Sequence, residues 1–224
     1  MPKHMRMLGA MLMATMVVAW VSSWGPLASA ASKKALAPVP QTGQTQCWDA
    51  NGNLINCAGT GQDGDLQPGV DWPTPRFTDN QNGTVTDNLT GLIWLQNPFC
   101  TTLSPVDWLT ALSHAKSLAN GQCGLMDGSK AGDWRVPTVK ELLSLIDYEF
   151  AFPALSNAAG TGQSTEDNPF ALHDLGSGFG NFWSSTTSMR DPRSVWVLHV
   201  HIGEIAEFPK EGIPSELWPV RGGD

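Results

Sequence analysis

The chain has 224 residues and a formal net charge of −8, from 21 Asp and Glu against 13 Lys and Arg. A chain this acidic repels phosphate backbones at long range, which excludes nucleic acid as the expected partner and disfavours heavily sulfated polymers. The length suffices for one ordinary domain with its own apolar core and an extended leading segment.

The amino terminus has the features of a signal peptide. Lys3 and Arg6 precede an apolar stretch over residues 7–27, and the small residues Ala28-Ser29-Ala30 follow it. This order of basic, apolar and small residues predicts a signal peptide over residues 1–30 that is cleaved. An uncleaved membrane anchor is the competing interpretation, because the stretch is nearly long enough to cross a bilayer. Either way, we expect an exported protein.

The four cysteines predict disulfide bonds, since an even number is typical of exported chains. Three connectivities are possible, and we favour Cys47–Cys57 and Cys100–Cys123 because each closes a local loop. Asn51-Gly52, inside the first loop, is a strong hairpin-turn signal. Residues 31–70 are therefore expected to be a linker with a disulfide-stapled hairpin, and residues 71–224 a single domain.

The domain is predicted to open with a β-meander. Short apolar or β-branched runs at Phe77, Thr84–Thr86 and Leu92–Trp94 alternate with turn residues such as Asn82-Gly83.

Two helices are predicted next. Ser104 as N-cap and Pro105 at the first helical position predict a helix over residues 105–119. A second helix begins at Thr138, because Glu141 three residues later completes a capping box. Its buried stripe consists of apolar residues at helical spacing, namely Val139, Leu142, Leu143 and Ile146.

The segment just before the second helix combines an acid, an aromatic residue and an arginine. Pro137 biases Val136 toward extended backbone, so Trp134 and Val136 should face the core while Arg135 points away. We expect Arg135 to bond carbonyls or one of the acids Asp133, Glu141 and Asp147, and so to lock a strand-to-helix corner. A structural role is favoured, with catalysis by Arg135 or Glu141 as the alternative.

The rest of the chain predicts a long irregular region followed by strands. Gly, Asn, Ser and Pro dominate from Phe150 to Gly180, and strands are expected over residues 182–187, 195–202 and 217–221. Strands, two helices, a long loop and strands again indicate an α+β fold rather than a parallel βαβ pattern.

Five ordered blocks resemble those of one bacterial family. They read TDNQNGTVTDNLTGLIW, GDWRVPTVKELLSLID, FWSSTT, VWVLHVHIG and LWPVRGGD, and the resemblance covers roughly residues 75–223. The family is named after the C-terminal domain of Lcl, a collagen-like adhesin of Legionella. The resemblance implies a C-type-lectin-like fold in a secreted, periplasmic or cell-surface protein, with no established catalytic residues.

The resemblance supports the fold more than the ligand. The named adhesin binds sulfated glycosaminoglycans, whereas this chain is acidic and has no collagen-like repeat. We predict non-catalytic recognition of carbohydrate or another extracellular component, with a structural envelope protein as an open alternative. The oligomeric state stays open, and a homo-oligomer is one possibility. The long region from Phe150 to Arg193 should supply the contacts, with candidates Glu166, Asp167, Asn168, His173, Asp174, Asn181 and Arg190.

The rival hypothesis is a metal-dependent enzyme. His199 and His201 form an H-x-H pattern on a predicted strand, so both side chains should point to one face, as paired zinc ligands require. Glu204, His173 or Asp174 would complete that site. Oxygen ligands for calcium are available from Asp63, Asp65, Asp79, Asn80, Asn82 and Asp87. Solvent-facing histidines and Asx turns explain both patterns more simply, so no cofactor is expected.

A hydrolase triad of Ser184 or Ser185 with His199 and Asp191 can also be assembled, but no nucleophile-elbow motif supports it.

Ten tryptophans against a single tyrosine make a skewed aromatic usage. Exposed indoles would suit stacking on sugars, because their large flat faces are apolar. Most are nevertheless expected in the core, since they lie inside periodic or family motifs, namely Trp94, Trp108, Trp134, Trp183 and Trp196.

Overall fold

The computed structural model describes residues 39–100, 105–165, 167–172 and 180–222. The chain divides into residues 1–35 and a compact unit over residues 36–224, and every described residue belongs to the second unit. The expected signal peptide, Ser104 and three of the expected ligand contacts (Glu166, His173 and Asp174) lie outside the described residues. No helix in these ranges is long and apolar enough to cross a membrane.

The strands form three sheets, all with antiparallel neighbours. The two-stranded sheet pairs β1 (Cys47–Trp48) with β2 (Leu54–Ile55). The four-stranded sheet has the order β3-β4-β5-β9, with strands Phe77–Asp79, Thr84–Asp87, Ile93–Leu95 and Val220–Arg221. The three-stranded sheet has the order β6-β7-β8, with strands Asn181–Thr187, Ser194–His199 and Glu204–Pro209.

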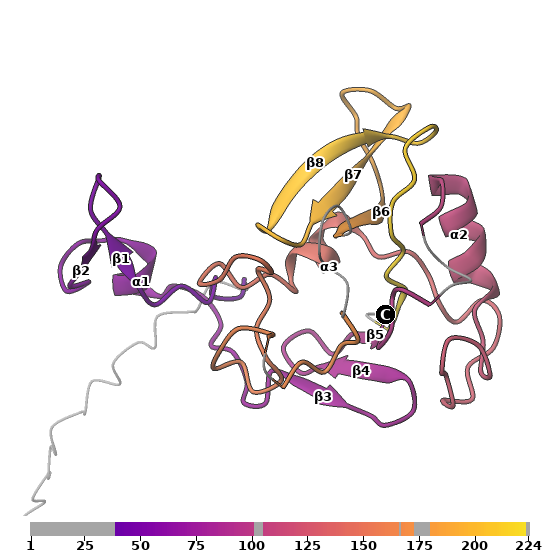
Figure 1. Cartoon of the computed structure of the whole chain (residues 1–224), viewed down its shortest axis with the longest axis horizontal. Coiled ribbons are helices and arrows are strands. Elements are labelled where there is room, and N and C mark those ends of the chain that lie inside the picture. The colour runs from indigo at the N-terminus through magenta and orange to yellow at the C-terminus, as the bar shows by residue number, and fades with distance from the viewer. Residues whose placement is uncertain (1–38, 101–104, 166, 173–179, 223–224) are drawn as a thin grey trace, which may run out of the picture. The chain divides into compact units, whose positions relative to one another are not determined.

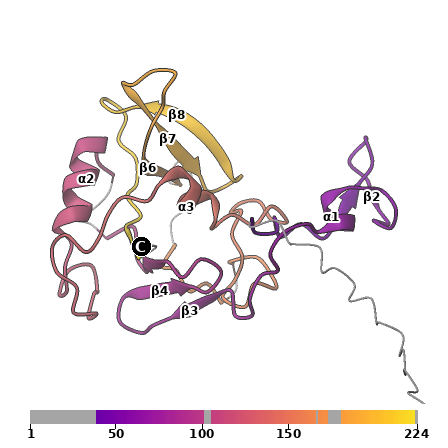
Figure 2. The ribbon, with the colours of Figure 1, turned by 180° about the vertical axis from the view of Figure 1, so that it is seen from behind.

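The helices are α1 (Asp63–Leu66), α2 (Trp108–Ser117) and α3 (Val139–Leu143). Figures 1 and 2 show the three-stranded sheet and strands β3 and β4 on opposite sides of the domain, with α2 along one flank. The short helix α3 contacts β6 and β7. Few helices and several antiparallel sheets confirm the predicted α+β class.

Two clusters of buried side chains form the core. Trp218 is central to the first, with its ring centroid 4.9 Å from that of Phe170 and 5.0 Å from that of Phe182. Trp183 belongs to the second cluster, and it packs against Phe208 at 6.4 Å. The tryptophans that are at most 1% exposed are Trp94, Trp134, Trp183 and Trp218.

Both favoured disulfides, Cys47–Cys57 and Cys100–Cys123, are present. The first closes the β1–β2 hairpin, whose turn contains Asn51-Gly52 as predicted. Gly52 has φ +80° and donates its N–H to Asp49 O at 3.0 Å, so the turn uses the backbone freedom of glycine.

The start of α2 differs from the prediction. The helix begins at Trp108 rather than at residue 105, because the side chain of Asp107 caps it by accepting the Thr110 N–H at 2.9 Å. Val106 pairs with Ser215 in an antiparallel bridge, which holds it outside the helix.

Other boundaries also differ. The strand expected over residues 195–202 ends at His199, because residues 200–203 form the turn into β8. The last strand pairs only at Val220–Arg221. Neither α1 nor β8 has a clear sequence signal, since DGDL and EIAEFP lack an apolar period.

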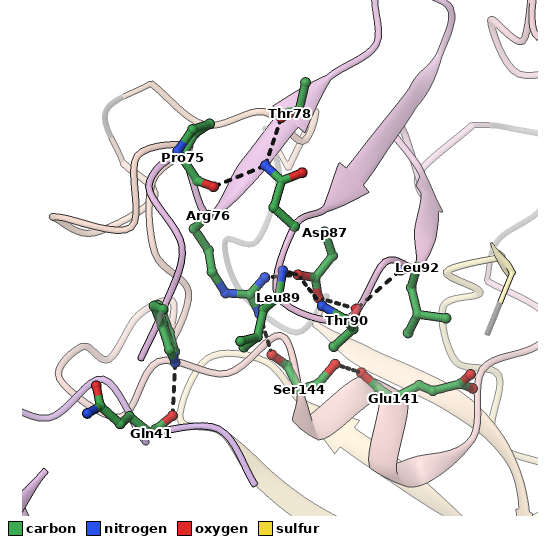
Figure 3. Close-up of polar contacts among 12 residues, drawn as sticks. Gln41, Pro75, Arg76, Thr78, Asp87, Leu89, Thr90, Leu92, Glu141 and Ser144 are labelled. Carbon is green, nitrogen blue, oxygen red and sulfur yellow. Dashed lines mark hydrogen bonds and ion pairs between the residues drawn. The ribbon is translucent and has the colours of Figure 1, made fainter. Parts of the chain in front are cut away.

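A buried ion pair between Arg76 and Asp87 joins three parts of the domain (Figure 3). Both side chains are 0% exposed, and Arg76 also donates to Ser144 O, at the end of α3, at 2.6 Å. Asp87 in turn accepts the Leu89 N–H at 2.8 Å and the Thr90 hydroxyl at 2.7 Å. Burial lowers the pKa of Arg76, while the Asp87 carboxylate opposes that shift. Arg76 therefore connects the start of β3, the end of β4 and the end of α3.

Residues 42–46 are held against the chain that follows α3. The Tyr148 N–H donates to Thr42 O at 2.9 Å, and the Glu149 carboxylate accepts the N–H groups of Thr45 at 2.7 Å and Gln46 at 3.3 Å. Part of the segment expected as a linker is thus bonded to the main domain.

Asp147 is a buried acid beside this contact, with 4% exposure. Gly43 has φ +88°, and a Cβ there would lie 2.2 Å from Oδ1 of Asp147, so a substitution of this glycine would be strained. Burial and the nearby charge of Glu149 raise the pKa of Asp147 to about 6, although the Glu149 N–H and the charge of Arg76 pull it down.

Replacing Arg76 by Met should strongly destabilise the fold, because Asp87 would keep a buried charge without its partner. Removing one member of a buried pair costs about 3–5 kcal/mol, and urea unfolding monitored by tryptophan fluorescence would measure it. Arg193→Met is the matched control. Its pair with Asp191 is exposed, and such pairs contribute at most about 1 kcal/mol. Equal losses for the two variants would contradict the structural role of Arg76.

Asp147 should make the fold more stable in mild acid. Its folded pKa of about 6 lies above the ordinary 3.8, so its stabilising contribution is complete below pH 3.8 and is lost as pH rises through 6. The unfolding free energy of the unmodified protein should therefore fall by on the order of 1 kcal/mol more between pH 5 and 7.5 than that of the Asp147→Asn variant. Unfolding in urea at both pH values would test this, and an unchanged pH dependence would contradict it.

Candidate functional site

The corner before α3 has a structural arrangement. Thr138 and Glu141 form the predicted capping box. Arg135 makes two bonds to the Glu141 carboxylate, at 2.8 and 2.6 Å, and one to Gly222 O at 3.0 Å. Trp134 and Val136 are buried on either side of it. Burial raises the pKa of Glu141, but the bonds from Arg135 and Thr138 outweigh it and leave that pKa below its ordinary value. The acid is thus fully engaged in holding the corner.

The two histidines of the H-x-H pattern do not share a strand, contrary to the expectation. His199 is the last residue of β7 and lies edge-on to Phe208 at 5.5 Å, whereas His201 is in the following turn, 6.2 Å from Phe152. Glu204 pairs with His199 across the sheet. Within the described ranges, no three His, Cys, Asp or Glu side chains are grouped to hold a metal ion.

The oxygen-rich residues around β3 and β4 bond their own hairpin. Asp79 accepts the Gln81 N–H at 2.7 Å, and Asn82 accepts the Thr84 hydroxyl at 2.7 Å. Asp87 is committed to Arg76. Their positions are explained by turn formation and the buried ion pair.

The residues of the hypothetical hydrolase triad are not brought together. Ser184 donates to Trp196 O at 2.6 Å, and Ser185 donates to Pro137 O at 3.2 Å. His199 lies opposite Asn181, the first residue of β6, in the β6–β7 pairing. The Asp191 carboxylate accepts hydrogen bonds from the Arg193 guanidinium.

The described ligand candidates are also scattered. Asp167 accepts the Ala158 N–H at its carbonyl, and the Asn168 side chain accepts the Phe170 N–H at 2.9 Å. Asn181 begins β6, whereas Arg190 follows its other end. Of this group, Arg190 alone lines one of the open hollows described below.

That hollow lies on one face of the three-stranded sheet, around Trp196. Along β7, Val195 and Val197 are fully buried on the core face, so Trp196 points to the opposite face and is only half-buried. The open hollow measures ≈ 670 Å³ and is lined by Thr186, Thr187, Ser188, Met189, Arg190, Trp196, Ile205, Ala206 and Glu207. We name it the Trp196 hollow. The expectation that Trp196 belongs to the core was therefore wrong.

Trp108 is another half-buried indole, but its polar atom and its face are both occupied. Its N–H donates to Ser184 O at 2.9 Å, and the Lys210 ammonium lies 4.4 Å from the ring centroid. Among the described residues, no hydrogen bond is made by the indole N–H of Trp196.

Two charged side chains form the polar rim of the Trp196 hollow. Glu207, directly opposite Trp196 on β8, accepts the Ser188 hydroxyl at 2.5 Å and a guanidinium N–H of Arg190. The Glu207 side chain is 13% exposed and that of Arg190 82%. Ser188 also accepts the Arg190 backbone N–H at 3.2 Å, which fixes the loop that carries the arginine.

The sequence contained a signal for this site. Alternation in Val195-Trp196-Val197 places the two valines on one face of the strand and the tryptophan on the other. The indole therefore had to lie on the face opposite to the valines. Glu207 had no such signal, because nothing in the sequence predicts that β8 lies beside β7.

A second open hollow, of ≈ 800 Å³, lies near the Cys100–Cys123 disulfide. Three of its polar side chains already bond the backbone. Asp79 accepts the Gln81 N–H at 2.7 Å, Gln96 donates to Pro169 O at 3.2 Å, and Asn97 accepts the Phe99 N–H at 3.0 Å. The Trp196 hollow combines an indole face with the Arg190 side chain, which is 82% exposed.

A family model described as the Lcl C-terminal domain matches residues 83–221, more than half of the chain. The chain belongs to the Lcl C-terminal domain family. A comparison with curated proteins found no match. The residues that line the Trp196 hollow and the Arg135–Glu141 pair lie within the segment matched by the Lcl C-terminal domain.

Arg135→Ala should lower stability and leave ligand binding unchanged, because the guanidinium holds Glu141 and the chain end rather than lining the Trp196 hollow. Charge-assisted hydrogen bonds contribute about 1.5–3 kcal/mol each, and partial exposure places the expected loss near the lower figure. Urea unfolding would measure it, with Arg135→Lys as the intermediate case. A folded variant that loses only binding would contradict this assignment.

Proposed function

We propose that this chain is an exported, non-catalytic recognition protein, and that its Lcl C-terminal domain binds carbohydrate in the Trp196 hollow. The observation that carries the proposal is the half-buried indole of Trp196, which lines an open hollow beside the Arg190–Glu207 ion pair. An indole face stacks on the apolar face of a sugar ring, and a neighbouring guanidinium and carboxylate can bond its hydroxyl groups.

The wider setting supports an extracellular or envelope location. Two disulfides require an oxidising compartment to form, and the family is associated with an adhesin. The predicted signal peptide over residues 1–30 agrees with both. The ligand would be a surface or extracellular glycan.

The C-type-lectin-like arrangement is part of the same proposal. Strands, two helices, a long irregular region and a final antiparallel sheet occur in that order, and residues 144–180 contain no helix or strand element among those described. We further propose that binding needs no metal ion, because the Trp196 hollow offers a single carboxylate, and Ser188 and Arg190 already engage it.

Trp196→Ala should weaken glycan binding at least about tenfold, since a stacked aromatic contributes on the order of 1.4 kcal/mol or more. A glycan array run with and without calcium would identify a ligand, and titration against that glycan would compare the variants. Trp48→Ala is the matched control, because it also removes an exposed indole but lies in the hairpin. Glu207→Gln should weaken binding less than the loss of the indole.

Three results would contradict the proposal. Absence of binding to every glycan would contradict the carbohydrate assignment. Equal losses of affinity in the Trp196→Ala and Trp48→Ala variants would show that the Trp196 hollow is not the binding site. Stoichiometric zinc in elemental analysis of the purified protein would favour the metal-dependent alternative with His199 and His201.

A further inference from the structure

The β1–β2 hairpin exposes an apolar pair on one face. Trp48 and Leu54 lie directly opposite one another on the two strands and are 44% and 60% exposed. We name this pair the hairpin face. Residues 39–70 contain no Lys, Arg or His, so their charge comes entirely from Asp49, Asp63 and Asp65. The hairpin face is thus an apolar surface in an acidic segment.

Polar contacts fix the hairpin in addition to its disulfide. Asp49 accepts the N–H groups of Asn51 at 2.8 Å and Asn53 at 2.9 Å across the turn. The Asn53 side chain bonds the same carboxylate at 2.9 Å and, with the backbone contacts, lowers the pKa of Asp49. A partner would therefore meet an ordered surface, which lowers the entropy cost of binding.

The two edges of the hairpin differ. In an antiparallel pair, opposite residues alternate between those that bond each other and those whose backbone groups point outward. Trp48 is of the outward kind, because its N–H donates to the Gln62 side chain at 3.0 Å and its C=O accepts from that side chain at 3.0 Å. Gln62 therefore covers the edge of β1.

Leu54 must then also point its N–H and C=O outward, on the free edge of β2. Within the described residues, neither group makes a hydrogen bond. An open strand edge is a template for a further strand, and native proteins usually cover or charge such edges. In this hairpin Gln62 covers the edge of β1, whereas the edge of β2 at Leu54 stays open.

We propose that the open edge of β2 and the hairpin face together bind an extended segment of a partner protein in which apolar and cationic residues alternate. The outward N–H and C=O of Leu54 select an extended backbone, as in strand addition. Every second side chain of that strand would lie beside Leu54, on the face that Leu54 shares with Trp48, and is therefore apolar. The remaining side chains are cationic, which matches a segment whose only charges are negative.

A short synthetic peptide that alternates Leu and Lys is the probe, and the full chain with both disulfides formed is the target. Amide exchange followed by NMR should show the Leu54 N–H protected at least about tenfold on adding peptide. Peptides alternating Leu with Glu, or Ser with Lys, should bind at least about tenfold more weakly. A Leu–Lys peptide that is N-methylated on its bonding edge should not bind, and this arm needs no protein variant.

Two variants locate the contact on the protein. Leu54→Pro removes the outward N–H but no bond between β1 and β2, so it should abolish binding. Leu54→Ile is the matched control, because it keeps the N–H and an apolar, strand-forming side chain and should retain most of the binding. Glycan binding at Trp196 should be the same in both variants.

Several results would overturn the proposal. Undiminished binding of the N-methylated peptide would show that the open edge of β2 does not bind the peptide backbone. Equal binding of the Ser–Lys peptide would show that the hairpin face does not contribute to binding. Protection of Leu54 that rises with protein concentration, without peptide, would show that a second copy of this chain is the occupant.

Discussion

The buried contact of Arg76 with Asp87 is the interaction on which the domain depends. Arg76 has no access to water, so its charge is tolerable only while Asp87 and the Ser144 carbonyl remain in place. Those partners come from the end of β4 and the end of α3, which are far apart in the sequence. A single guanidinium therefore fixes the four-stranded sheet relative to α3, the helix whose N-terminus is capped by Thr138 and Glu141.

The three-stranded sheet uses its faces differently along its length. Val195 and Val197 pack with Trp183 in the core, whereas Trp196, between them, is only half-buried and lies opposite Glu207. Because the core face is completed by valines and Trp183, the opposite face can expose an indole without loss of the fold. The proposed glycan site is thus carried by a rigid sheet, which holds Trp196 and Glu207 in fixed register.

The hairpin segment adds a second surface of different chemistry. Thr45 and Gln46 bond to Glu149, and Gly43 packs on Asp147, so the hairpin is attached to the domain through acids near α3. Asp147 itself is buried beside this attachment, and its pKa is raised to about 6. Sugar stacking at Trp196 and strand addition at Leu54 would be independent, because they use separate sheets.

Local chemistry in the sequence was sufficient for several features. The Thr138–Glu141 capping box, the Asn51-Gly52 turn and both disulfides involve residues near one another in the chain, and each was predicted correctly. Sequence patterns alone also determined the α+β class and the family. Only the tertiary structure decided that Asp87 pairs with Arg76, that β8 places Glu207 beside Trp196, and that Leu54 lies on an open edge. Those outcomes depend on contacts between distant segments, and neither residue spacing nor local propensity encodes which segments meet.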